Sequence, residues 1–140
     1  MRETMPHLHM SIPPQVAALP RARLCLRAFL SLHVGDDDAI DDVVLCVQEA
    51  MKNSIRFSAS KDSIEVDVAL LDHVVEARVR DFGAGFDVAP DVKALRLADP
   101  LSQSGRGLFL IRTLSDELKF VVDGGVEILI VKKLERHTHP

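Results

Sequence analysis

Two neighbouring segments of the chain alternate between apolar and polar side chains, with a short turn at residues 71–73 between them. A period of two residues is typical of a β-strand with one face buried and the other in water. The inward-facing side chains are Ile64, Val66, Val68 and Leu70 in the first segment and Val75, Ala77 and Val79 in the second. The pair predicts an antiparallel hairpin, whose apolar face needs a covering layer.

Two segments with helical spacing can supply that layer. In residues 16–33 we expect the apolar face to follow Leu24, Arg27, Ala28 and Leu32, broadened by Leu26, Phe29 and Leu30. Pro20 is tolerated near the first turn of this helix, and Gly35 ends it. The second helix begins after an acidic N-cap at residues 36–38 and runs to about Ser58. Its predicted core stripe is Ile40, Val43, Val44, Val47, Met51 and Ser54.

The remaining patterns complete a fold class. Residues 8–13 predict a short edge strand, which Pro13 and Pro14 end. Residues 118–122 and 125–133 predict a second hairpin around the Asp-Gly-Gly turn at 123–125. Because strands and helices are segregated along the chain, we predict an α+β two-layer sandwich, a mostly antiparallel sheet with helices on one face. Residues 1–140 are expected to form one domain.

A carboxylate and an amide lie on the far side of the second helix from its core stripe. Glu49 and Asn53 are four residues apart, which places them on one helix face, one turn apart. A carboxylate can accept a proton from a hydroxyl or a water, and an amide oxygen is a hard ligand suited to Mg²⁺. This mixed face suits a cleft, although an exposed helix face with ordinary polar residues remains an alternative.

A second candidate position lies at the end of the first hairpin. Asp81 has the same parity as the buried residues of its strand, so its carboxylate is expected to point toward the apolar layer. Gly83 and Gly85 follow, and glycines allow close approach to the main chain. Asp followed by Gly-x-Gly suits a base with an exocyclic amine, but a turn aspartate before a loop is an equally ordinary interpretation.

A poorly patterned stretch, predicted to be a lid at about residues 87–105, comes next and has room for a short helix around residues 92–97. The sequence Gly105-Arg106-Gly107 then opens an apolar helix that starts with Leu108 and is expected to end near residues 116–117. A glycine-rich helix start presents backbone N–H groups to an anion. No Gly-Lys-Ser/Thr follows, so this is not a Walker motif.

Composition excludes several classes of protein. The net charge is −4, and six Phe are the only large aromatic residues, which argues against nucleic-acid binding. No apolar run has the length of a membrane span, and the N-terminal residues hold no apolar signal core, so we expect a cytoplasmic protein. Cys25 and Cys46 fall within the helical segments and are expected to be small buried apolar residues.

Taken in order, the three motifs resemble the N, G1 and G2 boxes of the GHKL ATP-binding superfamily, whose ATP-binding domain has the Bergerat fold. Glu49-x-x-x-Asn53, Asp81-x-Gly83-x-Gly85 and Gly105-x-Gly107 carry the resemblance. In length and pattern the chain is most similar to the RsbW-like anti-sigma-factor serine/threonine kinases, over nearly its whole length.

The resemblance implies the following roles. Glu49 would be the catalytic base that activates a substrate hydroxyl, and Asn53 would bind Mg²⁺ and nucleotide. Asp81 would accept a hydrogen bond from the adenine amine. The other implied ATP-binding residues are Arg56, Phe57, Gly83, Gly85, Phe86, Gly105, Arg106, Gly107 and Leu108. The implied partners are a STAS-type anti-anti-sigma protein as phosphoacceptor and a sigma factor, with a homodimer as a further possibility; from the composition we expect no direct nucleic-acid partner and no membrane.

One departure from that pattern keeps other interpretations open. Anti-sigma kinases usually carry His four residues after the Asn, whereas this chain has Phe57, with Arg56 before it, as in the N box of histidine kinases. The alternatives are a non-catalytic module that binds nucleotide or sigma factor, and a detached ATP-binding domain of a histidine kinase. The presence of Glu49 argues against the non-catalytic module, because a pure binder has no need of a base.

Overall fold

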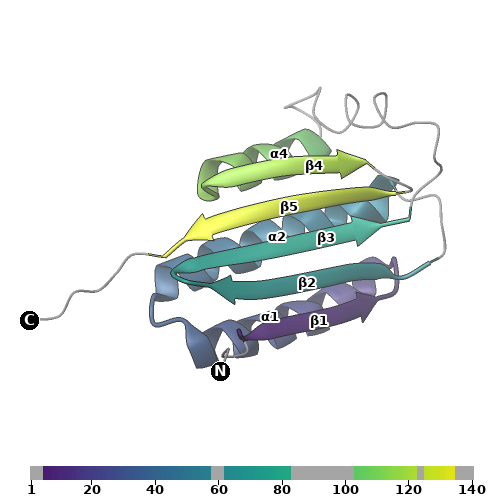
Figure 1. Cartoon of the computed structure of the whole chain (residues 1–140). Coiled ribbons are helices and arrows are strands. Elements are labelled where there is room, and N and C mark those ends of the chain that lie inside the picture. The colour runs from purple at the N-terminus through teal and green to yellow at the C-terminus, as the bar shows by residue number, and fades with distance from the viewer. Residues whose placement is uncertain (1–4, 58–61, 83–102, 123–124, 135–140) are drawn as a thin grey trace, which may run out of the picture.

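The computed structural model describes residues 5–57, 62–82, 103–122 and 125–134. The element labels follow Figure 1. The strands are β1 (His7–Ile12), β2 (Ile64–Leu71), β3 (Val74–Asp81), β4 (Glu117–Val122) and β5 (Val126–Lys133), and the helices are the 3₁₀ turn η1 (Val16–Ala18), α1 (Leu19–His33), α2 (Asp37–Phe57) and α4 (Gln103–Leu114).

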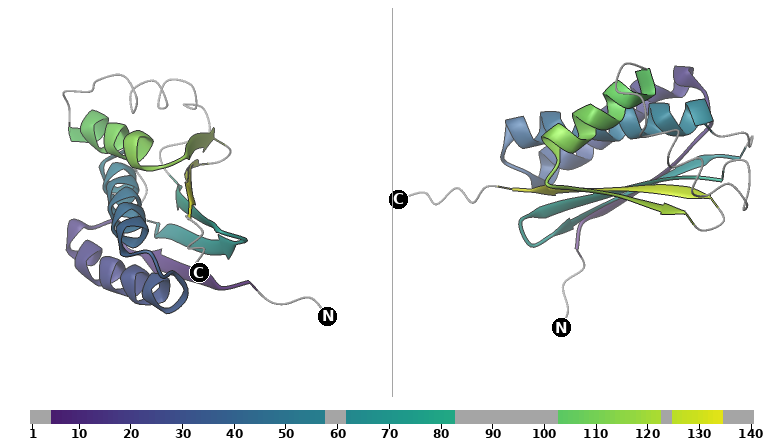
Figure 2. Two further views of the ribbon diagram at one scale, coloured as in Figure 1. Left: turned by 90° about the vertical axis from the view of Figure 1, so that its left-hand side faces the viewer. Right: turned by 90° about the horizontal axis from the view of Figure 1, so that it is seen from above.

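The strands form one antiparallel sheet in the order β1-β2-β3-β5-β4. Both predicted hairpins are confirmed, and β1 lies at an edge of the sheet and ends directly before Pro13 and Pro14. The helices cover one face of the sheet, with α2 between α1 and α4 (Figure 2). The predicted α+β sandwich is therefore confirmed.

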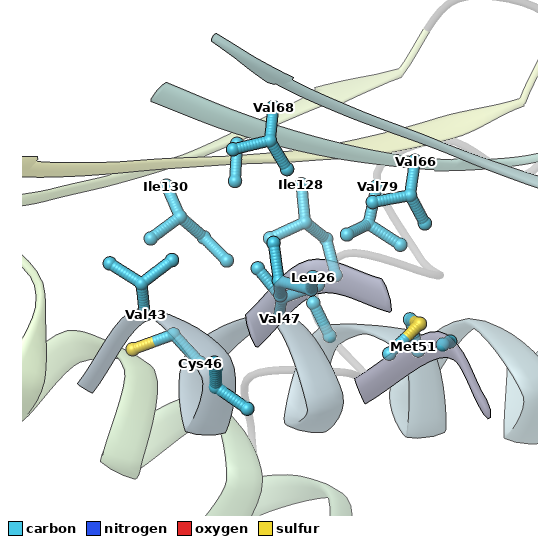
Figure 3. Packing of buried hydrophobic residues seen from close by; sticks show 14 of the residues in the cluster. Leu26, Val43, Cys46, Val47, Met51, Val66, Val68, Val79, Ile128 and Ile130 are labelled. Atoms are coloured by element: carbon cyan, nitrogen blue, oxygen red, sulfur yellow. The ribbon is translucent and has the colours of Figure 1, made fainter. Parts of the chain in front are cut away.

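The core lies between this sheet and α2. The inward side chains of the first hairpin are buried as the alternation predicted, apart from the half-buried Leu70. Ile130 and Ile128 of β5 face Val43 and Val47 of α2, and Met51 lies beneath Val66 and Val79 of β2 and β3 in the same layer (Figure 3). All six residues of the predicted α2 stripe are buried. Burying a Val, Leu, Ile or Met side chain contributes about 1.5–3 kcal/mol, so this layer fixes how α2 sits on the sheet.

Local polar contacts set the ends of the helices. The side chain of Asp36 caps α2, because its Oδ1 accepts from the backbone N–H of Ala39 at 3.1 Å, as the acidic N-cap predicted. The ammonium of Lys132 in β5 donates to Asp42 of α2 at 3.0 Å and to the carbonyl oxygen of Leu114 at 2.7 Å. Lys132 thereby joins the end of α4 to α2 and the sheet.

The predicted apolar face of α1 is confirmed for Leu26 and Leu30 but wrong for Leu24 and Leu32. The buried residues are Leu19, Ala22, Leu26 and Leu30, whereas Leu24 is 72% exposed and Leu32 is 79% exposed. Leucine occurs on two faces of this helix, and its sequence alone cannot rank them. Leu24 and Leu32, eight residues apart, form the exposed row of α1. Cys25 is also exposed, contrary to prediction.

The other cysteine is buried as predicted. Burial raises the pKa of the Cys46 thiol to about 12, so it stays protonated near neutral pH and acts as a small apolar core residue.

The start of α4 also differs from prediction. The helix begins at Gln103, so Gly105 and Gly107 lie inside its first turns and not in a loop before it. It ends at Leu114, and Glu117 already belongs to β4. Most of the predicted lid and its short helix at 92–97 fall outside the described residues. Among the residues that the structure describes, no helix is both long and apolar enough to cross a membrane.

Candidate active site

The candidate site begins on the side of α2 that faces α4. The side chain of Glu49 is only 10% exposed and Asn53 is 4% exposed, although neither belongs to the core stripe. Both groups are therefore held in a cleft, as the mixed character of this helix face suggested. A carboxylate and an amide one turn apart in a sheltered place can bind or deprotonate a ligand more effectively than the same groups in open water.

Gly107 brings α4 directly against Glu49. A Cβ atom added at Gly107 would lie 2.9 Å from Glu49 Oε1 and 3.5 Å from Glu49 Cβ. The space that a larger residue would fill is thus already occupied by the carboxylate. Gly107 was expected to hold phosphate from a loop, but in the structure it is the point where α4 and α2 approach each other.

A pocket of about 220 Å³ opens at this contact. Its lining residues are Val16, Glu49, Lys52, Asn53, Ile55, Arg56 and Gly107. The oxygen-bearing side chains are largely buried, whereas Lys52 and Arg56 are exposed. Two cations beside an acid and an amide give a pocket that can hold a charged phosphate and a hard metal ion together.

Two donors reach one oxygen of Glu49. The amide Nε2 of Gln48 and the ammonium of Lys52 each donate to Glu49 Oε2 at 3.4 Å. These long contacts leave Oε1 on the side of Gly107. The carboxylate is therefore oriented, with one oxygen toward its donors and the other toward α4.

Asp81 lies where the strand period placed it, fully buried at the end of β3 and opposite Val126 of β5. Gly125 makes this position possible, because a Cβ added there would overlap the backbone carbonyl oxygen of Asp81. Asp81 is not among the residues that line the pocket at Glu49. Its predicted role at the adenine amine would require the nucleotide to extend from that pocket to the end of β3.

The other predicted ligand residues divide into four groups. The guanidinium of Arg56 lies 5.8 Å from the ring centroid of Phe57, and Arg56 lines the pocket while Phe57 does not. Leu108 is 4% exposed and belongs to the hydrophobic core, so only its backbone could reach a ligand. Gly105 and Arg106 lie in the first turns of α4, and Gly83, Gly85 and Phe86 lie outside the described residues.

Three lining residues were not predicted from the sequence. Lys52 follows Glu49 by three residues, and this spacing alone could have indicated its contact. Val16 and Ile55 join the pocket through the packing of η1 and α2, which no local pattern reveals.

The central helix of this α+β sandwich thus carries a sheltered acid and amide beneath a second helix, at a pocket that two cations also line. A family model described as the histidine kinase-like ATPase domain matches residues 12–132, and the chain belongs to this family. Its similar relatives include the serine-protein kinase RsbW of Bacillus licheniformis, which is 30% identical over 97% of this chain and 91% of that protein. RsbW of Listeria monocytogenes serovar 1/2a is 31% identical over 91% of this chain and 90% of that protein.

Solved structures agree with this assignment. A crystal structure of the RsbU and RsbW domains of a Mycobacterium tuberculosis protein matches 96% of this chain with a TM-score of 0.72 and 25% identity. The match spans 34% of that longer chain. The SiaB-SiaC complex from Pseudomonas aeruginosa matches 89% of this chain and 88% of the other with a TM-score of 0.58, and at 18% identity it supports the fold alone.

Proposed function

We propose that this chain is an ATP- and Mg²⁺-dependent serine/threonine protein kinase of the anti-sigma type. The observation that carries the proposal is the sheltered carboxylate of Glu49, one helical turn from Asn53 and oriented by two donors. A protein that only bound nucleotide would have no need of a base at this place. The near full-length similarity to serine-protein kinases supports the same conclusion.

The chemistry assigned to Glu49 is proton removal. As the hydroxyl oxygen of the acceptor serine forms a bond to the γ-phosphorus of ATP, a carboxylate oxygen of Glu49 takes the hydroxyl proton. The bond between the γ-phosphorus and the bridging oxygen then breaks, and ADP leaves with that oxygen. Phosphoryl transfer depends mainly on positioning and charge neutralisation, which Lys52 and Arg56 at the pocket can supply.

The residues present fit the implied metal and nucleotide. Asn53 lines the pocket and carries an amide oxygen of the kind that Mg²⁺ takes, and the absence of a side chain at Gly107 lets α4 lie against Glu49. Mg²⁺, held by Asn53, would neutralise phosphate charge when bound. We assign the adenine amine to Asp81, and we keep the Gly83, Gly85, Phe86, Gly105 and Arg106 contacts as predictions.

The proposed phosphoacceptor is a serine or threonine of a STAS-type anti-anti-sigma protein, and the second proposed partner is a sigma factor. A second copy of the chain is a further proposed partner. We further propose that residues 1–140 act as one domain, with a lid at about 87–105, and that the protein works in the cytoplasm.

The test combines purified protein, γ-labelled ATP, Mg²⁺ and a purified STAS-domain protein. The wild type should label the STAS protein on serine or threonine. Glu49→Gln should lower kcat by about 10²–10⁴-fold, the usual contribution of a general base, while the Kd for ATP changes little. Glu76→Gln is a matched control, because Glu76 pairs with Arg78 on the outer face of the sheet.

Two results would contradict the proposal. Absence of label from folded protein that binds both ATP and the STAS protein would favour the non-catalytic module. Label appearing on a histidine of a separate protein would favour the histidine-kinase interpretation, which Phe57 alone supports. If Glu49→Gln weakened ATP binding as much as turnover, Glu49 would be a binding residue.

A further inference from the structure

A chain of hydrogen bonds connects α1 to the candidate base. Arg23 Nη1 donates to Gln48 Oε1 at 2.7 Å, and Gln48 Nε2 donates to Glu49 Oε2 at 3.4 Å. We propose that Arg23 is a positioning residue for Glu49 and acts through the amide of Gln48. This inference rests on the proposed function, because it assumes that the orientation of Glu49 matters for phosphoryl transfer.

The hydrogen-bonding capacity of the three side chains determines which end of the Gln48 amide faces Arg23 and which faces Glu49. A guanidinium can only donate and a carboxylate can only accept, whereas an amide has one accepting and one donating end. With Arg23 on one side, the oxygen of Gln48 must face α1, so its NH₂ group must face Glu49. Arg23 therefore selects the one amide orientation that can donate to the base.

The arrangement is also sheltered enough to hold its geometry. Arg23 and Gln48 are both half-buried, and the 2.7 Å contact is a short charge-assisted hydrogen bond. Lys52, the other donor to Glu49 Oε2, is half exposed and lies on a long flexible stem. The amide is consequently the more rigid of the two donors, and its loss should let the carboxylate turn.

The structure offers a matched control on the same helix. One turn after Arg23, the guanidinium of Arg27 donates to Asp41 Oδ1 at 2.9 Å. Both arginines join α1 to α2, but only Arg23 leads to Glu49. A loss caused merely by weaker docking of α1 should appear in both variants, whereas a loss of positioning should appear in one.

The experiment compares Arg23→Met, Gln48→Met and Arg27→Met in the ATP and STAS-protein assay. Arg23→Met and Gln48→Met each break the chain of hydrogen bonds from Arg23 to Glu49, which we call the relay. In these two variants kcat should fall by about tenfold to a hundredfold, as for a catalytic group displaced by ~1 Å, and the KM for Mg-ATP should stay within about twofold of wild type. Arg27→Met should keep kcat within about twofold. Arg23→Lys keeps a donor to Gln48 and should recover most of the activity.

Coupling and spectroscopy complete the test. The Arg23→Met, Gln48→Met double variant should lose no more activity than the less active of the two single variants, because both changes break the same relay. The side-chain NH₂ resonances of Gln48, identified by their loss in Gln48→Met, should shift in Arg23→Met and in Glu49→Ala, but not in Arg27→Met.

The outcomes separate the two proposals. Additive losses, equal losses in Arg23→Met and Arg27→Met, or wild-type kcat in Arg23→Met would overturn the positioning role while leaving the kinase assignment intact. If the wild type transfers no phosphate, the kinase proposal fails. The NH₂ resonances of Gln48 then still decide whether the relay exists, and unchanged resonances in Arg23→Met would overturn it.

Discussion

Replacing Gly107 by alanine should separate the stability of the fold from its chemistry. Gly107 lies inside α4, where alanine is the better helix former by about 0.8–1.0 kcal/mol. The new Cβ would lie 2.9 Å from Glu49 Oε1, so the carboxylate has to move by several tenths of an ångström. The atom in the way is the far end of a flexible side chain and not backbone, which makes the movement inexpensive for the fold.

The magnitudes nearly cancel for stability but not for catalysis. Turning Glu49 partly out of its rotamer costs about 0.5–1.5 kcal/mol, which offsets the gain in helix propensity. The free energy of unfolding should therefore stay within about 1 kcal/mol of the wild-type value. The base, however, is displaced relative to its donors Lys52 and Gln48, and kcat should fall by about tenfold to a hundredfold.

The assay needs urea unfolding and phosphoryl transfer on the same preparations. Gly35→Ala is the control, because a Cβ added at Gly35 meets no atom within 4 Å. That variant should change neither quantity appreciably. Wild-type kcat in Gly107→Ala would contradict this prediction, since Glu49 would then tolerate displacement. A loss of stability well beyond 1 kcal/mol would show that the backbone, and not Glu49, absorbs the new methyl group.

Three further predictions concern the fold. Leu26→Ala should lower the free energy of unfolding by about 2–5 kcal/mol, whereas Leu24→Ala should change it by less than about 0.5 kcal/mol. Similar values for the two variants in urea unfolding would contradict the observed buried face of α1. Gly125→Ala should destabilise the chain by about 1–3 kcal/mol through its overlap with the Asp81 carbonyl, and a neutral result would place that strand end elsewhere. The hydrogen bond between His9 and Asp67, at 2.8 Å, raises the pKa of His9 in the folded protein. The stabilisation from this pair is therefore fully present below the ordinary histidine pKa and is lost as pH rises through the pKa of His9 in the folded state. His9→Gln should therefore be less stable than wild type near about pH 6 and equal to it near about pH 9, and a difference independent of pH would exclude this pair as the cause.

Much of the fold was predictable because its elements have strict periods. Alternation in residues 64–79 fixed both the hairpin and the inward direction of Asp81, since a strand has only two faces. The core stripe of α2 was equally clear, because its opposite face carries acids and amides. The acidic N-cap at Asp36 is a local interaction and needs no tertiary information.

The wrong predictions fall in segments whose sequence is compatible with two different local arrangements. Leucines on both faces of α1 left its buried face undecided, and only packing against α2 and the sheet selects Leu26 and Leu30. The start of α4 was placed too late, because glycine disfavours helix in isolation while contact with α2 stabilises it here. The contact between Gly107 and Glu49 joins distant segments and has no sequence period at all.

The hydrogen bond between Arg23 and Gln48 connects positions 25 residues apart on different helices. The amide at position 48 needs a donor at position 23 to hold its orientation, and Arg23 needs that amide to act on Glu49. Over evolutionary time, substitutions at these two positions should therefore occur together. Related chains with a lysine at position 23 can retain the amide at 48, whereas an apolar residue at 23 should be accompanied by loss of that amide. An acidic residue at 48 would keep the arginine but place a second negative charge beside the base.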